Sequence, residues 1–179
     1  MAAPPLLVSI AALRRGHEHR RREQRAGPIR GLQVTGSAVP PGAEVALDVM
    51  VELVDGGVLV SGTVEAPWSG ECRRCLNPVE GTVIVPVREL YQPRADRRPG
   101  SAPDDDEETY PLVGDQLDLT PLARDAVLLE LPLAPLCRVD CAGLCPTCGA
   151  DRNAGPCDCQ PAADPRWSAL DALRPDPNA

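Results

Sequence analysis

Apolar and polar residues alternate in two consecutive runs near the centre of the chain. The stretch "EVALDVMVELV", residues 44–54, carries an apolar residue at every second position. The stretch "VLVSGTVEA", residues 58–66, alternates in the same way, and Asp55-Gly56-Gly57 between them is a turn signal. A period of two places the apolar side chains on one face of a strand. The pattern therefore predicts a β-hairpin with one buried, valine-rich face.

A third run, "TVIVPVRELY" at residues 82–91, extends this hairpin into an antiparallel meander. Pro86 interrupts the run, and because proline lacks a backbone donor, we expect this strand at an edge or a bulge of the sheet. The pattern predicts an α+β fold. In this fold, an antiparallel β-meander or partly open barrel carries a few short helices and a C-terminal Cys-rich zinc-knuckle segment.

Shorter elements flank the meander. Residues 6–10, "LLVSI", are predicted as a short strand, after which Ser9 caps a brief helix that extends through Arg15. Residues 110–119, "YPLVGDQLDL", are predicted as one further strand. A last short helix is predicted within residues 164–173, "DPRWSALDAL", where an acidic cap precedes a proline.

A longer helix is predicted in "TPLARDAVLLELP", residues 120–132. Thr120 is a suitable N-cap, Pro121 suits the first helical position and Pro132 ends the helix. The expected buried stripe consists of Leu122, Ala126 and Leu129.

The order of these segments predicts a body and two small appendages. Residues 1–136 form the β-rich body, within which residues 92–109 carry proline and charge without an apolar pattern and are predicted as a mobile acidic loop. Residues 137–162 form a Cys-rich zinc-binding segment, and residues 163–174 carry the short C-terminal helix.

Composition narrows the class of protein. The 179 residues include no Phe, two Trp and two Tyr, so the core is short of large aromatic side chains and depends more than usual on cross-links or metals. The net charge of −8 argues against a surface coated with phosphate-binding groups. No apolar stretch is long enough to span a membrane, and the N-terminal segment lacks the order of a signal peptide. We expect a cytoplasmic protein.

Arginines are concentrated between residues 14 and 30, which hold seven Arg, two His and two Glu. Residues 16–30 of this stretch have no apolar periodicity and are predicted as a solvated loop or flexible arm. The alternative is a strip that contacts RNA phosphates, because clustered Arg side chains release condensed counterions on binding. The candidate RNA contacts are Arg14, Arg15, Arg20, Arg21, Arg22 and Arg25.

Eight cysteines carry the strongest chemical signal. In a reducing cytoplasm, such a set is more typical of metal ligands than of disulfides. Cys145 and Cys148 have the C-x-x-C spacing of a zinc knuckle, and Cys157 and Cys159 follow after a short polar loop. These four thiols form one predicted site. The remaining four form a second one that joins the hairpin tip "CRRC" to the C-terminal segment: Cys72, Cys75, Cys137 and Cys141.

Other arrangements of the thiols stay open. One is a single site made of Cys72, Cys75, Cys145 and Cys148, and others are a disulfide set or a redox-active C-x-x-C. A complete set of four thiolates leaves no coordination position for a substrate, so one or two zinc ions are predicted to be structural. Because each such site adds −2, two of them take the formal charge from −8 to about −12.

No other chemistry is indicated. His17 and His19 lie in the Arg-rich stretch without a partner motif, and no phosphate-binding glycine loop or dinucleotide fingerprint occurs. The sequence predicts a protein that is not an enzyme and has neither a small-molecule substrate nor a membrane association.

Several segments in a fixed order carry a resemblance to a known family. They are "GVLVSGTVEAPWSGECRRCLNPVEG", the acidic loop, "DLTPLARDAVLLELPLAPLC", "CAGLCPTCGADRN…CDC" and "DPRWSALDAL". From about Pro5 to Leu173, the chain resembles the DUF177 family, whose bacterial members are known as YceD, the large ribosomal RNA subunit accumulation protein. In that pattern the C-x-x-C pair looks more widespread than the C-terminal cluster, which fits two separable sites.

The resemblance implies a role in the synthesis, processing or stability of 23S ribosomal RNA, and hence in large-subunit assembly. The implied partners are the precursor large subunit, through 23S rRNA, a basic large-subunit ribosomal protein or both. An alternative is a zinc-stapled interaction module in another process, such as transcription. A thiol oxidoreductase is a third hypothesis.

Overall fold

Valines at alternate positions build the central sheet. In the computed structural model, which describes residues 6–16, 18–93, 109–160, 166 and 170, the three predicted strands are β4 (Glu44–Val54), β5 (Gly57–Glu71) and β6 (Pro78–Pro93). They pair antiparallel in sequence order. The predicted meander is therefore confirmed, and its inward valines are buried, except that Val85 and Val87 of β6 are only partly buried.

The sheet gains further strands at its sides. Along the path of the sheet the order is β2 (Arg20–Pro28), β4, β5, β6 and β7 (Tyr110–Leu112), and the short β3 (Ser37–Ala38) pairs with the far end of β5. β7 is parallel to β6, so the sheet is mixed at this edge. β2 and β7 lie at opposite ends of this order, and the sheet is not closed into a barrel.

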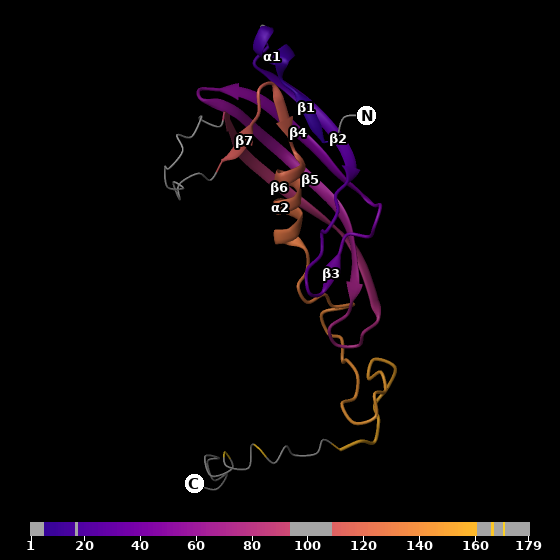
Figure 1. Ribbon diagram of the computed structural model, residues 1–179. Coiled ribbons are helices and arrows are strands. Elements are labelled where there is room, and N and C mark those ends of the chain that lie inside the picture. The colour runs from indigo at the N-terminus through magenta and orange to yellow at the C-terminus, as the bar shows by residue number, and fades with distance from the viewer. Residues whose placement is uncertain (1–5, 17, 94–108, 161–165, 167–169, 171–179) are drawn as a thin grey trace.

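One face of the sheet is covered by a second layer (Figure 1). This layer contains α2 (Thr120–Glu130) and a two-stranded sheet of β1 (Leu7–Ser9) and β8 (Gln116–Asp118). The predicted strand at 110–119 is thus two strands that belong to different sheets. Apolar residues of both layers form one core, in which Tyr91 is the only fully buried aromatic side chain among the described residues.

The N-cap of α2 and its buried face differ from the prediction. The N-cap of α2 is Leu119, while Thr120 is the first helical residue and its N–H donates to Asp118 Oδ1 at 2.9 Å. Leu122 is buried as expected, but Leu129 is 88% exposed, and the inward face continues through Val127 instead. The residues of the expected stripe share one side of the helix, but the buried face is centred further round the helix, on Leu122, Ala123 and Val127. Leu129 therefore falls beyond the edge of that face.

The first helix, α1 (Ala11–Arg15), is as brief as expected. Its N-cap is Ile10, so the predicted cap at Ser9 was wrong by one residue. The Ser9 hydroxyl still accepts a long hydrogen bond of 3.4 Å from the Ala11 N–H.

The Arg-rich stretch forms a strand, and its prediction as a solvated loop was wrong. β2 pairs with β4 over its full length, from Arg20 opposite Glu52 to Pro28 opposite Glu44. Its inward side chains are charged: Glu23 is buried and forms ion pairs with Arg21 and with Arg25, the latter at 2.6 Å. Because these inward positions hold ion pairs in place of apolar residues, the stretch lacks the periodicity that reveals a strand.

Two predicted segments fall outside this description. The mobile acidic loop coincides with residues 94–108, and the last helix lies in a region of which only Arg166 and Leu170 are described. Within the described part of the chain, no helix is long and apolar enough to cross a membrane.

The ion pair between Arg22 and Asp48 makes the stability of the sheet depend on pH. Two hydrogen bonds of 2.6 and 2.5 Å join the side chains, and with a bond from Gln24 they lower the pKa of Asp48 to about 2. An unfolded Asp has a pKa of about 3.9, so this stabilisation is complete above that pH and is lost as the pH falls through about 2. We expect Arg22→Ala to lower the free energy of unfolding at neutral pH but not near pH 2, as measured by urea denaturation.

Arg15→Ala is the matched control, since Arg15 has no ion-pair partner among the described residues and should unfold like the wild type at both pH values. In Arg22→Ala, the carboxyl carbon signal of Asp48 should titrate closer to the ordinary pKa of 3.8. A deficit in stability of equal size at both pH values would instead assign the effect to lost packing.

Candidate metal centre

The tip of the β5–β6 hairpin turns two thiols toward each other. The Cys72 N–H donates to Asn77 O at 2.8 Å, and the Leu76 N–H donates to Cys72 O at the same distance. Leu76 adopts a positive φ of 62°, which non-glycine residues rarely do. This tight loop buries Cys72 and Cys75, which are 0% and 4% exposed.

The segment after α2 brings two further thiols to this tip. It is held by backbone hydrogen bonds from Arg73 N to Pro135 O at 2.9 Å and from Leu144 N to Arg74 O at 3.0 Å. Gly143 permits this close approach: its φ is +71°, and a Cβ atom there would lie 2.9 Å from Arg74 O. The chain between these bonds therefore places Cys137 and Cys141 beside the hairpin thiols.

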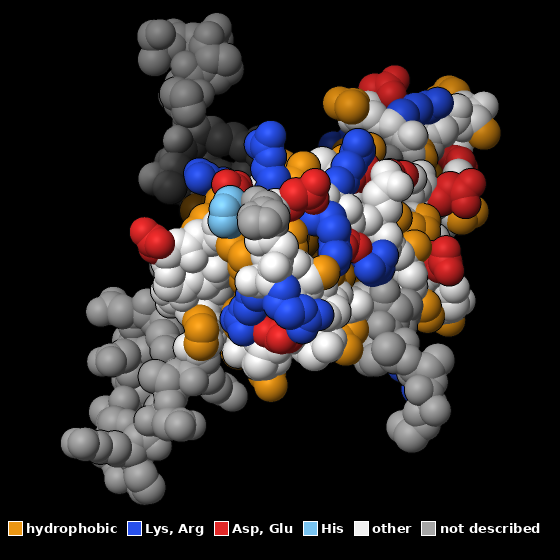
Figure 2. All heavy atoms as spheres, turned by 90° about the horizontal axis from the view of Figure 1, so that it is seen from above, with side chains coloured by type: hydrophobic (Ala, Val, Ile, Leu, Met, Phe, Trp, Pro, Cys, Tyr) orange, Lys and Arg blue, Asp and Glu red, His pale blue; other side chains and the backbone are white. Residues whose placement is uncertain are grey.

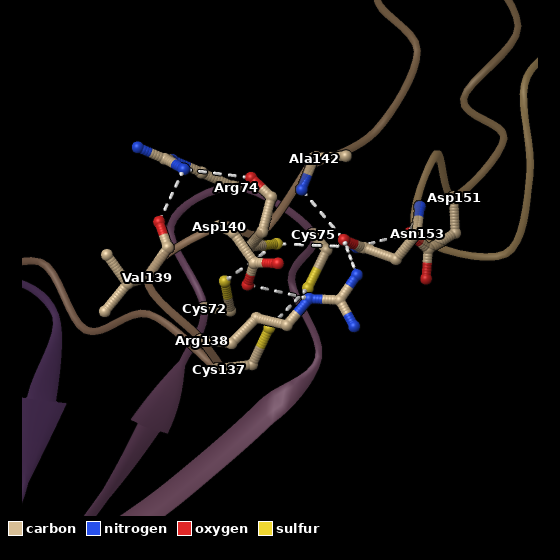
Figure 3. Close-up of polar contacts among 11 residues, drawn as sticks. Cys72, Arg74, Cys75, Cys137, Arg138, Val139, Asp140, Ala142, Asp151 and Asn153 are labelled. Carbon is tan, nitrogen blue, oxygen red and sulfur yellow. Dashed lines mark hydrogen bonds and ion pairs between the residues drawn. The ribbon is translucent and has the colours of Figure 1, made fainter.

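These four sulfur atoms have the spacing of a tetrahedral metal site (Figure 3). Cys72 Sγ lies 3.8 Å from Cys141 Sγ, and Cys75 Sγ lies 3.6 Å from Cys137 Sγ. All four lie within 4.8 Å of one another. A zinc ion with Zn–S bonds of about 2.3 Å holds its sulfur ligands roughly 3.8 Å apart. The donor set and its dimensions therefore fit such an ion. We call this group the hairpin site.

The other four thiols form a second group, the knuckle site, within the C-terminal segment. Its members are Cys145, Cys148, Cys157 and Cys159, whose sulfur atoms also lie within 4.8 Å of one another. The knuckle closes through the Gly149 N–H, which donates to Cys145 O at 2.9 Å, and Gly149 has the positive φ of 73° expected for this turn. Cys145 is buried, whereas the other three are more accessible.

The thiols of the hairpin site ionise unequally. Burial opposes ionisation of Cys72, but backbone hydrogen bonds, led by one from Cys137, outweigh it and lower its pKa to about 6. The pKa of Cys137 is raised to about 12, first because its thiol is hydrogen-bonded to Cys141. Neighbouring thiols of this kind share their protons, and a divalent cation would allow all four to ionise together.

The knuckle site has the same asymmetry. Backbone hydrogen bonds, the strongest from Cys148, lower the pKa of Cys145 to about 6. A different hydrogen bond, between the side chains of Cys148 and Cys159, is the main cause that raises the pKa of Cys159 to about 12. Each group therefore supplies at least one readily ionised sulfur to which a cation can bind first, and in the hairpin site the pKa of Cys141 is lowered as well as that of Cys72.

The eight thiols are grouped as the two predicted sets. No group of the mixed kind, with Cys72 and Cys75 beside Cys145 and Cys148, occurs among the described residues, and all eight cysteines are free of disulfides. That these residues ligate a metal stays a prediction. Asn153, which the sequence analysis did not single out, donates from Nδ2 to Cys141 Sγ at 3.4 Å. Its position between the two cysteine pairs of the knuckle was the only available signal.

The six candidate RNA-contact arginines lie toward the other end of the sheet, around α1 and β2 (Figure 1). Figure 2 shows Arg side chains interspersed with acidic ones on that end. Arg14 is paired with Asp115 at 2.6 Å, and Arg21, Arg22 and Arg25 form the pairs already described. Among the described residues, Arg15 and Arg20 have no ion-pair partner. Four of the six arginines are thus paired within the chain, with three carboxylates, because Arg21 and Arg25 share Glu23.

Comparison with known proteins gives a consistent result. Residues 60–174 match the family model described as "Large ribosomal RNA subunit accumulation protein YceD". Uncharacterized proteins of Mycobacterium tuberculosis and Mycobacterium bovis are each 42% identical over 174 residues, which cover 94% of this chain and 81% of theirs. A chloroplastic maize protein, "Large ribosomal RNA subunit accumulation protein YCED homolog 1", is 26% identical over 159 residues, or 74% of this chain and 54% of the maize protein. No solved structure matches significantly.

Metal analysis distinguishes the arrangements of thiols. We expect protein purified under reducing conditions to hold two zinc ions per chain, measured by elemental analysis. Cys72→Ser should remove the ion of the hairpin site and Cys148→Ser that of the knuckle site, because each substitution breaks one set of four ligands. Each variant therefore keeps one ion, and the double variant keeps none.

A single mixed site would give a different pattern, since either substitution alone would then abolish all binding. Metal-free wild-type protein with a reactive Cys72 would favour the redox hypothesis.

Proposed function

The chain belongs to the YceD family, and from that membership we propose that it supports the synthesis, processing or stability of 23S ribosomal RNA. It acts in the cytoplasm on precursor large ribosomal subunits, as a non-enzymatic assembly factor with two structural zinc ions. The observation that carries this proposal is the family match over residues 60–174. The matched range contains most of β5, all of β6, β7 and α2, and both cysteine groups.

A structural role for the metal follows from the completeness of its ligand sets. Four cysteine thiolates fill the coordination sphere of zinc and leave no position for water or a substrate. The hairpin site joins Cys75 to Cys137, which are 62 residues apart, and so fixes the C-terminal segment to the sheet. Metal binding at such a site contributes directly to folding.

Charge favours a basic ribosomal protein as the main partner. The chain carries a net charge of −8, which two filled zinc sites would make about −12. Four of the six candidate arginines form ion pairs within the chain, so their contact with RNA phosphates would require those pairs to break. A local rRNA contact then rests on Arg15 and Arg20, both of which are exposed.

Cell fractionation tests the proposed process. In a host depleted of this protein, we expect the ratio of 23S to 16S rRNA to fall, and the tagged protein should co-sediment with precursors of the large subunit on a sucrose gradient. Cys72→Ser should weaken both effects because the C-terminal segment is no longer fixed to the sheet. Migration with RNA polymerase and an unchanged rRNA ratio would contradict the proposal and favour a transcription module.

A salt titration tests the arginine contact. Each phosphate contact contributes about 0.9 or less to the slope of log affinity against log salt. If the protein binds rRNA through Arg15 and Arg20, the double substitution Arg15→Ala and Arg20→Ala should reduce that slope by about 1 to 2. Arg22→Ala is the control, because Arg22 is already paired with Asp48. An equal loss in both variants, or no loss in either, would contradict this contact.

A further inference from the structure

Asn153 belongs to one cysteine group by sequence and to the other by contact. It lies in the loop between Cys148 and Cys157 of the knuckle site. Its side chain, however, reaches the hairpin site, where Nδ2 donates to Cys141 Sγ at 3.4 Å (Figure 3). The same side chain accepts hydrogen bonds at Oδ1 from Ala142 N at 2.8 Å and from Arg138 Nη2 at 2.7 Å.

The closed knuckle loop holds Asn153 in this position. Asp151 Oδ1 accepts hydrogen bonds from the backbone N–H of Asn153 at 2.9 Å and from its Nδ2 at 2.6 Å. Asp151 forms a β-bridge with Leu144, and Arg152 N donates to Gly143 O at 2.9 Å. These bonds require the chain to turn back between the two cysteine pairs, which is the turn that closure of the knuckle site imposes.

A donor aimed at a ligating sulfur strengthens a metal site. An N–H···S hydrogen bond stabilises the negative charge on the thiolate and fixes the direction in which the sulfur points. Asn153 also fixes the backbone at Ala142, beside Cys141, so it orients this ligand from two sides. Outer partners of this kind typically change metal affinity by about 10- to 100-fold.

We propose that Asn153 is a positioning residue that couples the two metal sites, so that metal at the knuckle site strengthens metal binding at the hairpin site. The inference rests on the proposed zinc ligation of both groups. Because coupling between two binding equilibria is reciprocal, metal at the hairpin site strengthens binding at the knuckle site by the same factor.

Loop length indicates the order in which the sites fill. The knuckle site is made within one short segment, whereas the hairpin site must join Cys75 to Cys137 across 62 residues. The entropic cost of closing a loop rises with its length, so the knuckle site closes more readily. It then presents Asn153 to the hairpin site before that site is complete.

Cobalt titration against a competing chelator tests the coupling, because Co²⁺ bound to four thiolates gives a characteristic absorption spectrum. We expect Asn153→Ala to lower the Co²⁺ affinity of the hairpin site about 10-fold or more. Asn153→Asp keeps the acceptor for Ala142 and Arg138 but loses the donor to sulfur, so it should lower the affinity at least as much. Asn77→Ala is the matched control, because Asn77 lies beside Cys75 and no hydrogen bond of its side chain is found among the described residues.

Single-site variants separate the coupling from local damage. In a Cys72→Ser background, Asn153→Ala should leave the knuckle site within about 2-fold of its affinity without the substitution, since the coupled site is no longer filled. In otherwise native chains, Cys148→Ser should lower the affinity of the hairpin site, and Cys72→Ser should lower that of the knuckle site by the same factor. This reciprocal comparison does not depend on how any Asn153 variant folds.

The outcomes keep the inference separate from the metal assignment. The coupling would be overturned if each site bound its ion with an affinity that the other site does not affect. It would also be overturned if the Asn153→Asp variant kept the native affinity. Either result would leave the zinc sites intact. Failure of the wild type to bind any metal would overturn the zinc assignment itself.

Discussion

Mutual repulsion among thiolates is the constraint on which the arrangement of this molecule depends. Four sulfur atoms between 3.6 and 4.8 Å apart can all be ionised only around a cation. The segment after α2 is otherwise held to the β5–β6 tip by a few backbone hydrogen bonds, among them those accepted by Pro135 and Arg74, and by the Arg74 guanidinium, which donates to Val139 O and Cys141 O. The proposed metal therefore turns a lightly attached segment into a fixed extension of the sheet. This attachment matters more because the core contains only one fully buried aromatic residue among those described.

The two ends of the sheet differ in chemistry. At the end that carries α1 and β2, charged side chains pair with one another, and much of the local positive charge is neutralised. At the other end, the eight thiols lie in two groups of four. Within the described residues, the two ends of the sheet therefore differ in the groups that hold the chain together: ion pairs at one end and clustered thiols at the other.

The sequence was sufficient for those parts that follow a local rule. Alternating valines predicted β4, β5 and β6, and cysteine spacing predicted both groups of thiols. The sequence was insufficient where contacts with residues distant in the chain determine the structure. The inward face of β2 is filled by the ion pairs of Glu23, which erase the apolar period, and the exposure of Leu129 depends on where α2 meets the sheet. Asn153 is a further case, because its role arises only when two cysteine loops meet.

Pro86 lies on the open edge of β6, between its start at Pro78 and the short pairing with β7 that begins at Tyr91. Exposed strand edges can template the addition of further strands, and this one is long and rich in valine. A proline at its midpoint cannot donate a hydrogen bond to a partner strand, and its ring obstructs a continuous ladder. We therefore expect the residue that disturbs the alternating pattern to hinder edge-to-edge aggregation of the protein.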